Sequence, residues 1–221
     1  MFKTEDEFDK EILKHWGKTV VFKDGIINIE KYKKILWILK EPNRSNSDKE
    51  ENFRDFYSDV TGYGKWKSTF KRIILVSDMI TKKLKEIPDI DSIIKAENPL
   101  EKVAIININK NGGSSTTNIS KLKKQYNANK NILLDQVLGI APDLIINCTL
   151  VDDFYNDIIK QYKLTEKSFG KRPEIGYAYN PKKLIINYYH PNCRRRGMTD
   201  KWYCETILKI YQKWQKIINK S

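Results

Sequence analysis

Three polar side chains follow apolar runs in this 221-residue sequence, and their types suit hydrolysis of a polar substrate. Glu41 comes after the run Ile35–Leu39, Asn107 lies near the end of a second run, and His190 follows a third. A carboxylate can position a water or face a developing positive charge, an amide offers both a donor and an acceptor, and an imidazole can donate to an oxygen that gains negative charge. Each residue alone also fits an ordinary turn, so the interpretation depends on whether the fold brings them together.

Four segments that are apolar on consecutive residues predict strands covered on both faces. They are Ile35–Leu39, Val103–Ile108, Leu144–Cys148 and Leu184–Tyr188. Helical periodicity predicts helices at Trp66–Lys85, at residues 122–142 with a stop at Gly139 and Pro142, at Phe154–Tyr162 and at Trp202–Ile218. This alternation is typical of the α/β class, and we expect a doubly wound, three-layer αβα sheet with about four central parallel strands.

In such a sheet the ligand site lies outside the carboxyl ends of the strands, where Glu41, Asn107 and His190 would meet. The whole chain, residues 1–221, is expected to form a single domain. Weaker patterns predict a helix at residues 5–16, a hairpin turning at Asp24-Gly25, and a short helical connector between Pro88 and Pro99. The segment after Asn43 is expected to be a long polar loop that carries aromatic residues, and the segment around Tyr177 and Tyr179 an irregular stretch.

The chain is strongly basic, with 41 Lys and Arg against 28 Asp and Glu and a net charge of +13. This balance favours a polyanionic partner, with nucleic acid ahead of a membrane surface. The alternative is a lysine-rich composition with no partner. Arg194, Arg195 and Arg196 follow His190 closely and could bind phosphates, or form a solvated turn.

The three cysteines, Cys148, Cys193 and Cys204, form no CxxC pair. A disulfide framework and a zinc or iron–sulfur site are therefore not indicated, and the usage is typical of the cytoplasm. The first residues are charged and no run approaches the length of a membrane span. We expect a cytoplasmic protein, most simply a monomer, that needs neither a metal nor a cofactor.

Four motifs together resemble the uracil-DNA glycosylase superfamily in order and in spacing, across residues 35–196. They are Lys40-Glu41-Pro42-Asn43, Asn107-Ile108-Asn109-Lys110, the strand LIINCT, and Tyr189-His190-Pro191-Asn192. The nearest likeness is to the branch with a glutamate before proline in the first motif, an asparagine and a lysine three residues later in the second, and tyrosine-histidine-proline in the last.

The resemblance implies a monofunctional DNA glycosylase that flips a base out of DNA, hydrolyses its N-glycosidic bond and leaves an abasic site. Glu41 and His190 would be catalytic, with Glu41 acting on water or the sugar cation and His190 on the carbonyl oxygen of the departing base. Asn107 would read the base, and an aromatic side chain after the first motif would stack on it. The remaining site residues that it implies are Phe53, Phe56 and Tyr57 as stacking candidates, and Lys110, Asn192, Arg194, Arg195 and Arg196 as contacts with duplex or single-stranded DNA.

The sequence also departs from the family pattern. Lys40 occupies a position that is commonly glycine, the iron–sulfur cysteines of the branch are absent, and the last loop is rich in arginine. The sequence therefore leaves two substrates open, uracil and a modified base such as a hypermodified cytosine of phage DNA. It also leaves two biological roles open, DNA repair and antiviral defence.

Two other functions stay open. One is a nucleoside or nucleotide hydrolase of similar architecture, although Gly112-Gly113 with Ser114-Ser115 matches the standard phosphate-binding fingerprints poorly. The other is a non-catalytic DNA-binding module, in which Lys40 would pair with Glu41 and disable it.

Overall fold

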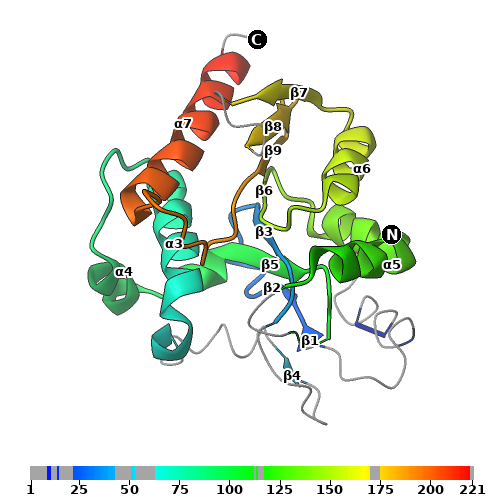
Figure 1. Ribbon diagram of the computed structural model, residues 1–221. Helices are drawn as coiled ribbons and strands as arrows, with labels where there is room; N and C mark the ends of the chain where they lie inside the picture. Colours follow the sequence, from blue (N-terminus) through cyan, green and yellow to red (C-terminus); the bar gives the residue numbers. More distant parts are fainter. Residues whose placement is uncertain are drawn as a thin grey trace.

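The computed structural model shows an α/β fold with a mixed seven-stranded sheet and a separate two-stranded pair (Figure 1). It describes residues 9–10, 14, 22–42, 51–52, 63–111, 113, 117–169 and 175–219. The strands are β1 (Phe22–Lys23), β2 (Gly25–Ile26), β3 (Ile35–Leu39), β4 (Glu51–Asn52), β5 (Val103–Asn107), β6 (Leu144–Asn147), β7 (Thr165–Ser168), β8 (Gly176–Tyr179) and β9 (Leu184–Asn187). The helices are α3 (Tyr63–Thr81), α4 (Ile90–Ala96), α5 (Ile119–Ile140), α6 (Asp152–Tyr162) and α7 (Asp200–Ile218), with a 3-10 turn at Pro99–Lys102.

The large sheet has the strand order β2-β5-β3-β6-β9-β8-β7. Neighbouring strands from β5 to β9 run parallel, whereas β2, β8 and β7 are antiparallel additions at the two edges. The carboxyl ends of the parallel strands are aligned by register, because Leu39 pairs with Asn107 and Asn147 pairs with Asn187. Their following loops consequently start at one edge of the sheet.

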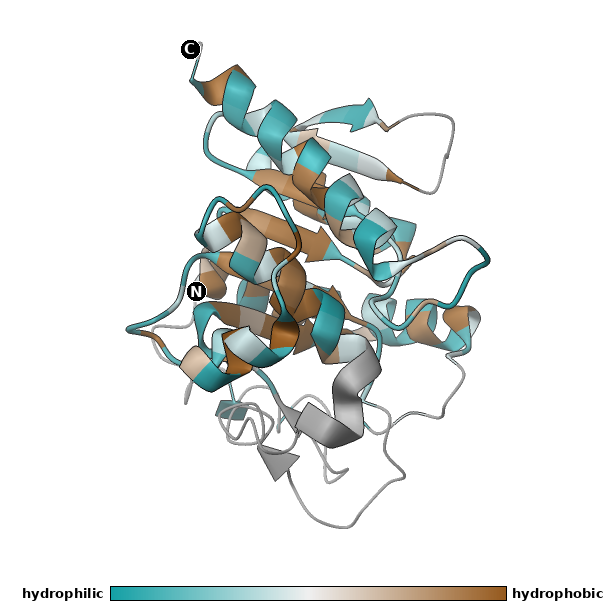
Figure 2. Ribbon diagram, turned by 90° about the vertical axis from the view of Figure 1, so that its left-hand side faces the viewer, coloured by the Kyte–Doolittle hydropathy of each residue, from teal (hydrophilic) through white to brown (hydrophobic). Residues whose placement is uncertain are grey.

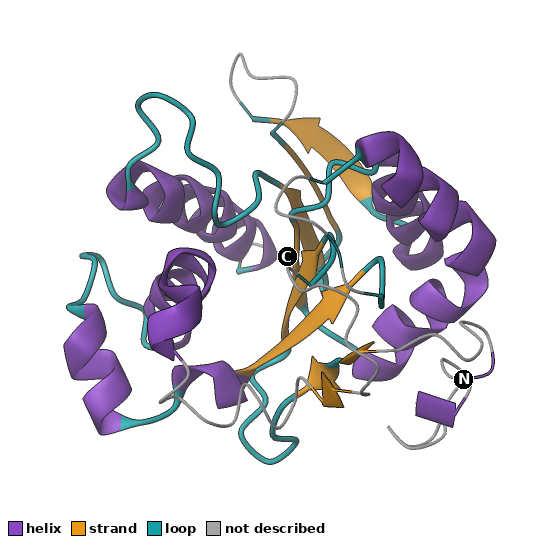
Figure 3. Ribbon diagram, turned by 60° about the horizontal axis from the view of Figure 1, so that its bottom comes forward, coloured by secondary structure: helices purple, strands orange, loops and turns teal. Residues whose placement is uncertain are grey.

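Helices cover both faces of this sheet, which gives three layers (Figure 3). Successive residues of β3 point to opposite faces, as strand geometry requires. Ile35, Trp37 and Leu39 enter a core with α3 and α7, whereas Leu36 and Ile38 enter a second core with α5 and α6. The consecutive apolar residues of the strand are thereby explained, since both of its faces are buried.

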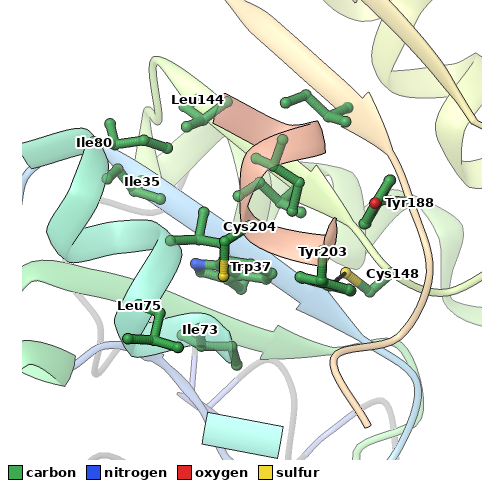
Figure 4. Packing of buried hydrophobic residues seen from close by; sticks show 14 of the residues in the cluster. Ile35, Trp37, Ile73, Leu75, Ile80, Leu144, Cys148, Tyr188, Tyr203 and Cys204 are labelled. Atoms are coloured by element: carbon green, nitrogen blue, oxygen red, sulfur yellow. Dashed lines mark hydrogen bonds between the residues drawn. The ribbon is translucent and has the colours of Figure 1, made fainter. Parts of the chain in front are cut away.

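The two cores are closely packed around the parallel strands. In Figure 2 the central strands are hydrophobic along their length, whereas the helices alternate between hydrophobic and hydrophilic residues. Trp37 lies in the first core beside Ile73, Leu75 and Cys204 (Figure 4). Its indole nitrogen donates to the Ser77 hydroxyl over 3.1 Å, so this buried donor is satisfied.

Most predicted elements are present, with shifted ends. All four central strands occur as predicted, three of them one residue shorter, and α4 is the expected connector. Helix α3 lies three to four residues earlier than predicted. Helix α5 begins three residues earlier than predicted and ends at Ile140, between the predicted stop residues Gly139 and Pro142, with Ala141 as a left-handed C-cap. The predicted helix at residues 5–16 lies mostly outside the described residues.

Two expectations about these segments were wrong. Residues around Asp24-Gly25 form no hairpin, because β1 pairs with β4 and β2 pairs with β5. The stretch with Tyr177 and Tyr179 is strand β8, which forms an antiparallel extension with β7. The sheet is therefore mixed, with four central parallel strands and antiparallel strands at its edges. Among the described residues no helix has the length and apolar character needed to cross a membrane.

Candidate active site

Backbone hydrogen bonds continue between the segments that follow β3 and β5, beyond the ends of the strands. The amide of Ile108 donates to the Leu39 carbonyl over 3.1 Å, and the amide of Asn109 donates to the Lys40 carbonyl over 3.0 Å. The Gly113 amide donates to the Pro42 carbonyl over 2.8 Å. These bonds fix the first two predicted motifs against each other at the carboxyl edge of the sheet.

Glu41 is half-buried at this edge, and its carboxylate is oriented by the second motif. The Asn109 side-chain amide donates to Glu41 Oε2 over 3.3 Å. A Cβ added to Gly113 would lie 2.3 Å from Glu41 Cδ, closer than any real contact, so this carboxylate position requires glycine at residue 113.

Lys40 precedes Glu41 but does not neutralise it. Among the described residues no hydrogen bond or ion pair joins the Lys40 amine to a carboxylate, and the Glu41 carboxylate is held by Asn109 instead. Partial burial lowers the pKa of Lys40, although Cys148, Cys193 and Glu41 act in the opposite direction. The pairing of Lys40 with Glu41 that would disable the carboxylate is absent from this structure.

His190 is held as a neutral imidazole with a defined donor. Burial, together with the nearby positive charge of Lys40, lowers the pKa of His190 from 6.5 to about 4. The Asn192 backbone amide donates to its Nδ1 over 3.2 Å. Because Nδ1 accepts, the proton of the neutral ring lies on Nε2, which can donate a hydrogen bond to a substrate.

Glu41 and His190 follow β3 and β9, which are separated by β6 alone. Two strand spacings amount to about 10 Å. This is the separation of the two strands, and it is of the size of a sugar or a base. Asn147, at the carboxyl end of the intervening strand β6, is fully buried. Its side-chain amide donates to Asn187 Oδ1 over 2.9 Å, and its Oδ1 accepts from the Thr149 hydroxyl.

The side chain of Asn107 is anchored by Asp24, a residue that sequence analysis assigned to a turn. The backbone amide of Asn107 donates to Asp24 Oδ2 over 2.7 Å, and its Nδ2 donates to the same oxygen over 3.3 Å. A carboxylate can only accept, so the orientation of the amide is fixed and Oδ1 is directed away from Asp24. Asn107 is 2% exposed. Asp24 occupies one N–H of this amide, and Oδ1 and the second N–H are not used by Asp24.

Lys110 lies in the interior, which corrects its expected contact with DNA. Its side chain is 0% exposed, and its ammonium donates to Asp24 Oδ1 over 2.6 Å and to Gln136 Oε1 over 2.8 Å. Burial lowers the pKa of Lys110, an effect that the Asp24 charge opposes. In this structure the lysine of the second motif supports Asp24, and through it Asn107, and does not reach a surface phosphate.

Arg72 of α3 fixes the loop that follows His190. Its Nε donates to Asp200 Oδ1 over 2.8 Å, and its other nitrogens donate to three carbonyls in the loop. These acceptors are the carbonyl oxygens of Pro191, Cys193 and Met198, at 2.9–3.0 Å. The guanidinium also lies 4.8 Å from the centre of the Tyr203 ring, and Arg72 is 8% exposed. The loop is thus a structured feature supported from within.

The predicted DNA contacts at this loop lie on the surface. Asn192, Arg194, Arg195 and Arg196 are all exposed. Arg195 packs on Tyr189, with its guanidinium 4.9 Å from the ring centre and 2.9 Å from the hydroxyl. The three arginines consequently form a positive surface beside His190, in which Arg195 has a fixed position.

Four residues of the predicted site are not tested by the described part of the chain. Phe53, Phe56 and Tyr57, the stacking candidates, lie outside the described residues, as does Asn43. Burial raises the pKa of the Cys148 and Cys204 thiols to about 12, so neither is a reactive thiolate. Within the described ranges no group of three or more His, Cys, Asp or Glu could hold a metal ion.

Sequence reasoning missed Asp24, Gln136, Asn147 and Arg72. One signal was present for Arg72, a lone arginine that begins the apolar stretch RIILV of α3. Asp24 gave none, because Asp-Gly is the usual sequence of a tight turn.

Comparison of the sequence with models of known protein families gives no match, and a search among curated proteins gives none either.

Proposed function

We propose that this chain is a DNA glycosylase that hydrolyses the N-glycosidic bond of a flipped nucleotide and leaves an abasic site. The observation that carries the proposal is that a neutral, oriented His190 and the Glu41 carboxylate stand at one edge of the sheet, after strands that are two spacings apart. The four-motif resemblance to the uracil-DNA glycosylase superfamily supports it at the sequence level.

The two groups suit the charge that develops when a glycosidic bond breaks. The C1′–N bond lengthens, the sugar becomes an oxocarbenium ion, and the electron pair moves to the base and its carbonyl oxygen. Glu41 faces the cation and orients the water that adds to C1′, while His190 Nε2–H donates to the oxygen. Both interactions strengthen only in the transition state, which is what lowers a barrier.

The fixed amide of Asn107 restricts the base that the site would accept. Its Oδ1 requires a donor on the Watson–Crick edge, such as the N3–H of uracil or the N4 amine of a cytosine. An edge with acceptors alone would leave this buried oxygen without a partner, at a cost of about 1–3 kcal/mol. A pyrimidine also supplies the carbonyl oxygen that His190 stabilises.

The net charge of +13 and the exposed arginines of the last loop support DNA as the partner. Flipping a paired base costs a few kcal/mol. Phosphate contacts made by Arg194 and Arg196 would offset this cost, and because Arg72 holds the loop, they would do so without a large ordering penalty.

The test is release of free base from DNAs that carry uracil, a thymine mismatch, hydroxymethylcytosine or glucosylated hydroxymethylcytosine. We expect one base to be released, with a rate about 10²–10³-fold lower in His190→Ala. Glu41→Gln should be comparably impaired, whereas Glu166→Gln, on the exposed face of β7, serves as the matched control and should retain the wild-type rate.

The same panel contains the results that would contradict the proposal. Tight DNA binding without release of any base would identify a non-catalytic DNA-binding module. Hydrolysis of free nucleosides in preference to DNA would identify a nucleoside hydrolase. The identity of the released base also shows whether the substrate is a repair lesion or a modified base of phage DNA.

A further inference from the structure

Lys40 is an amine at the proposed site for which the hydrolytic mechanism has no role. It directly follows β3, its backbone carbonyl accepts from Asn109, and its side chain is half-buried. In the described part of the chain no hydrogen bond or close ion pair joins its amine to an acidic group, and the adjacent Glu41, whose charge acts on Lys40, accepts its hydrogen bond from Asn109. Partial burial without a close ion pair disfavours the charged form of this amine.

The charge of Lys40 interacts electrostatically with groups on several segments that meet at the carboxyl edge of the sheet. It acts on His190 in the loop after β9, and its other electrostatic neighbours include Cys148 after β6 and Cys193 in the same loop. Lys40 directly follows β3 at the carboxyl edge of the sheet, and its charge acts on the loop that carries His190. The proposed function assigns the sugar of the flipped nucleotide to this edge.

Burial has a chemical consequence for this amine. It lowers the pKa of Lys40, which increases the neutral, nucleophilic fraction near neutral pH. A desolvated lysine is the usual amine for imine chemistry with carbonyl compounds. The sugar of an abasic site presents such a carbonyl, because its ring-opened form is an aldehyde at C1′.

We propose that Lys40 is a nucleophile that forms an imine with C1′ of the abasic sugar and gives the protein a strand-cleaving lyase activity. This inference rests on the proposed function, whose product is the abasic site, and it replaces the expectation of a monofunctional enzyme. Glu41, the neighbouring carboxylate, is the group placed to take a proton from C2′.

The steps balance without an external oxidant or reductant. The Lys40 nitrogen adds to the C1′ aldehyde, and loss of water gives the imine. A base removes a proton from C2′, the electron pair forms the C1′–C2′ enamine, and the C3′–O bond breaks with the phosphate as leaving group. Hydrolysis of the resulting unsaturated imine then returns the free lysine.

The test uses the full chain and a duplex in which the abasic site has been made before the protein is added. Borohydride reduces an imine to a stable amine, so we expect a covalent protein–DNA adduct, and peptide mapping should place it on Lys40. Lys40→Arg keeps the positive charge and removes the nucleophile. It should lose the adduct and the strand cleavage at least tenfold while it retains DNA binding.

The matched control is Lys182→Arg, in the exposed turn before β9 at the opposite end of that strand, which should behave as wild type. An adduct spread over other lysines, an adduct that persists in Lys40→Arg, or no adduct at all would overturn the inference. Because the abasic site is preformed, these outcomes are independent of base release. Base release without an adduct would refute only the lyase activity. An adduct on Lys40 without base release from any DNA of the panel would refute only the glycosylase activity.

Discussion

Removal of the Arg72 guanidinium should destabilise the protein and loosen the loop that carries His190. Arg72→Met keeps most of the apolar stem and deletes every donor. Three loop carbonyls, those of Pro191, Cys193 and Met198, then lose their partner in a region where Arg72 is only 8% exposed. Each such carbonyl costs about 1–3 kcal/mol if it stays dry.

Water will reach part of the space that the guanidinium leaves, so the summed cost of the three carbonyls is an upper bound on the loss of stability. Loss of one member of a buried, hydrogen-bonded ionic group typically costs about 3–5 kcal/mol, and we expect Arg72→Met to fall in that range. Its neighbour Lys71 provides the matched control. Lys71 pairs with the same Asp200 at 2.8 Å, but the two side chains are 36% and 35% exposed. Lys71→Met should therefore cost less than about 1 kcal/mol.

The assay combines urea unfolding with limited digestion by trypsin, which cuts after the exposed arginines 194–196. Arg72→Met should show a lower free energy of unfolding and faster cleavage at these arginines, whereas Lys71→Met should show neither. If the two variants lost equal stability and the loop were cut at the wild-type rate, the assignment of Arg72 as the support of this loop would be refuted.

Two further predictions concern the catalytic groups. The pKa of His190 is about 4 in the folded protein and about 6.5 when unfolded, so its contribution to stability is complete above pH 6.5 and is lost as the pH falls toward 4, by up to about 3 kcal/mol. Urea unfolding from pH 4 to 7 should show this loss in wild type and not in His190→Asn, and parallel curves would contradict it. Gly113→Ala should displace the Glu41 carboxylate and lower the base-release rate about 10²-fold with a small change in melting temperature, whereas Gly139→Ala, whose added Cβ meets nothing within 4 Å, should leave the rate unchanged. An unchanged rate in Gly113→Ala would show that the carboxylate position is not required.

The central strands could be predicted because their signal is local. Ile35–Leu39 is apolar at every position, and only a strand buried on both faces requires that pattern. The edge strands carried no such signal. β7 is exposed at all four positions, and β2 has two residues, so both are held by backbone pairing with a neighbour that local sequence does not reveal.

The candidate site likewise has a part that local sequence predicts and a part that it does not. Glu41 and His190 were identified because each follows a recognisable strand, and parallel strands bring their ends to one edge. The sequence could not show whether Lys40 pairs with its neighbour Glu41. That depends on the direction of the Glu41 carboxylate, which is set by contacts with Asn109 and Gly113.

The sequence by itself determined the α/β class, the order of the central elements and the types of the chemical groups at the strand ends. Only the tertiary structure decided which charges are buried. Asp24 and Lys110 are 86 residues apart and both 0% exposed in their side chains, and they share an ion pair because β2 joins the edge of β5. Hydrophobic patterning is a property of neighbouring residues, whereas the partner of a buried charge is set by long-range packing, so no local pattern could have given Lys110 its partner Asp24 or Arg72 its acceptors in the loop.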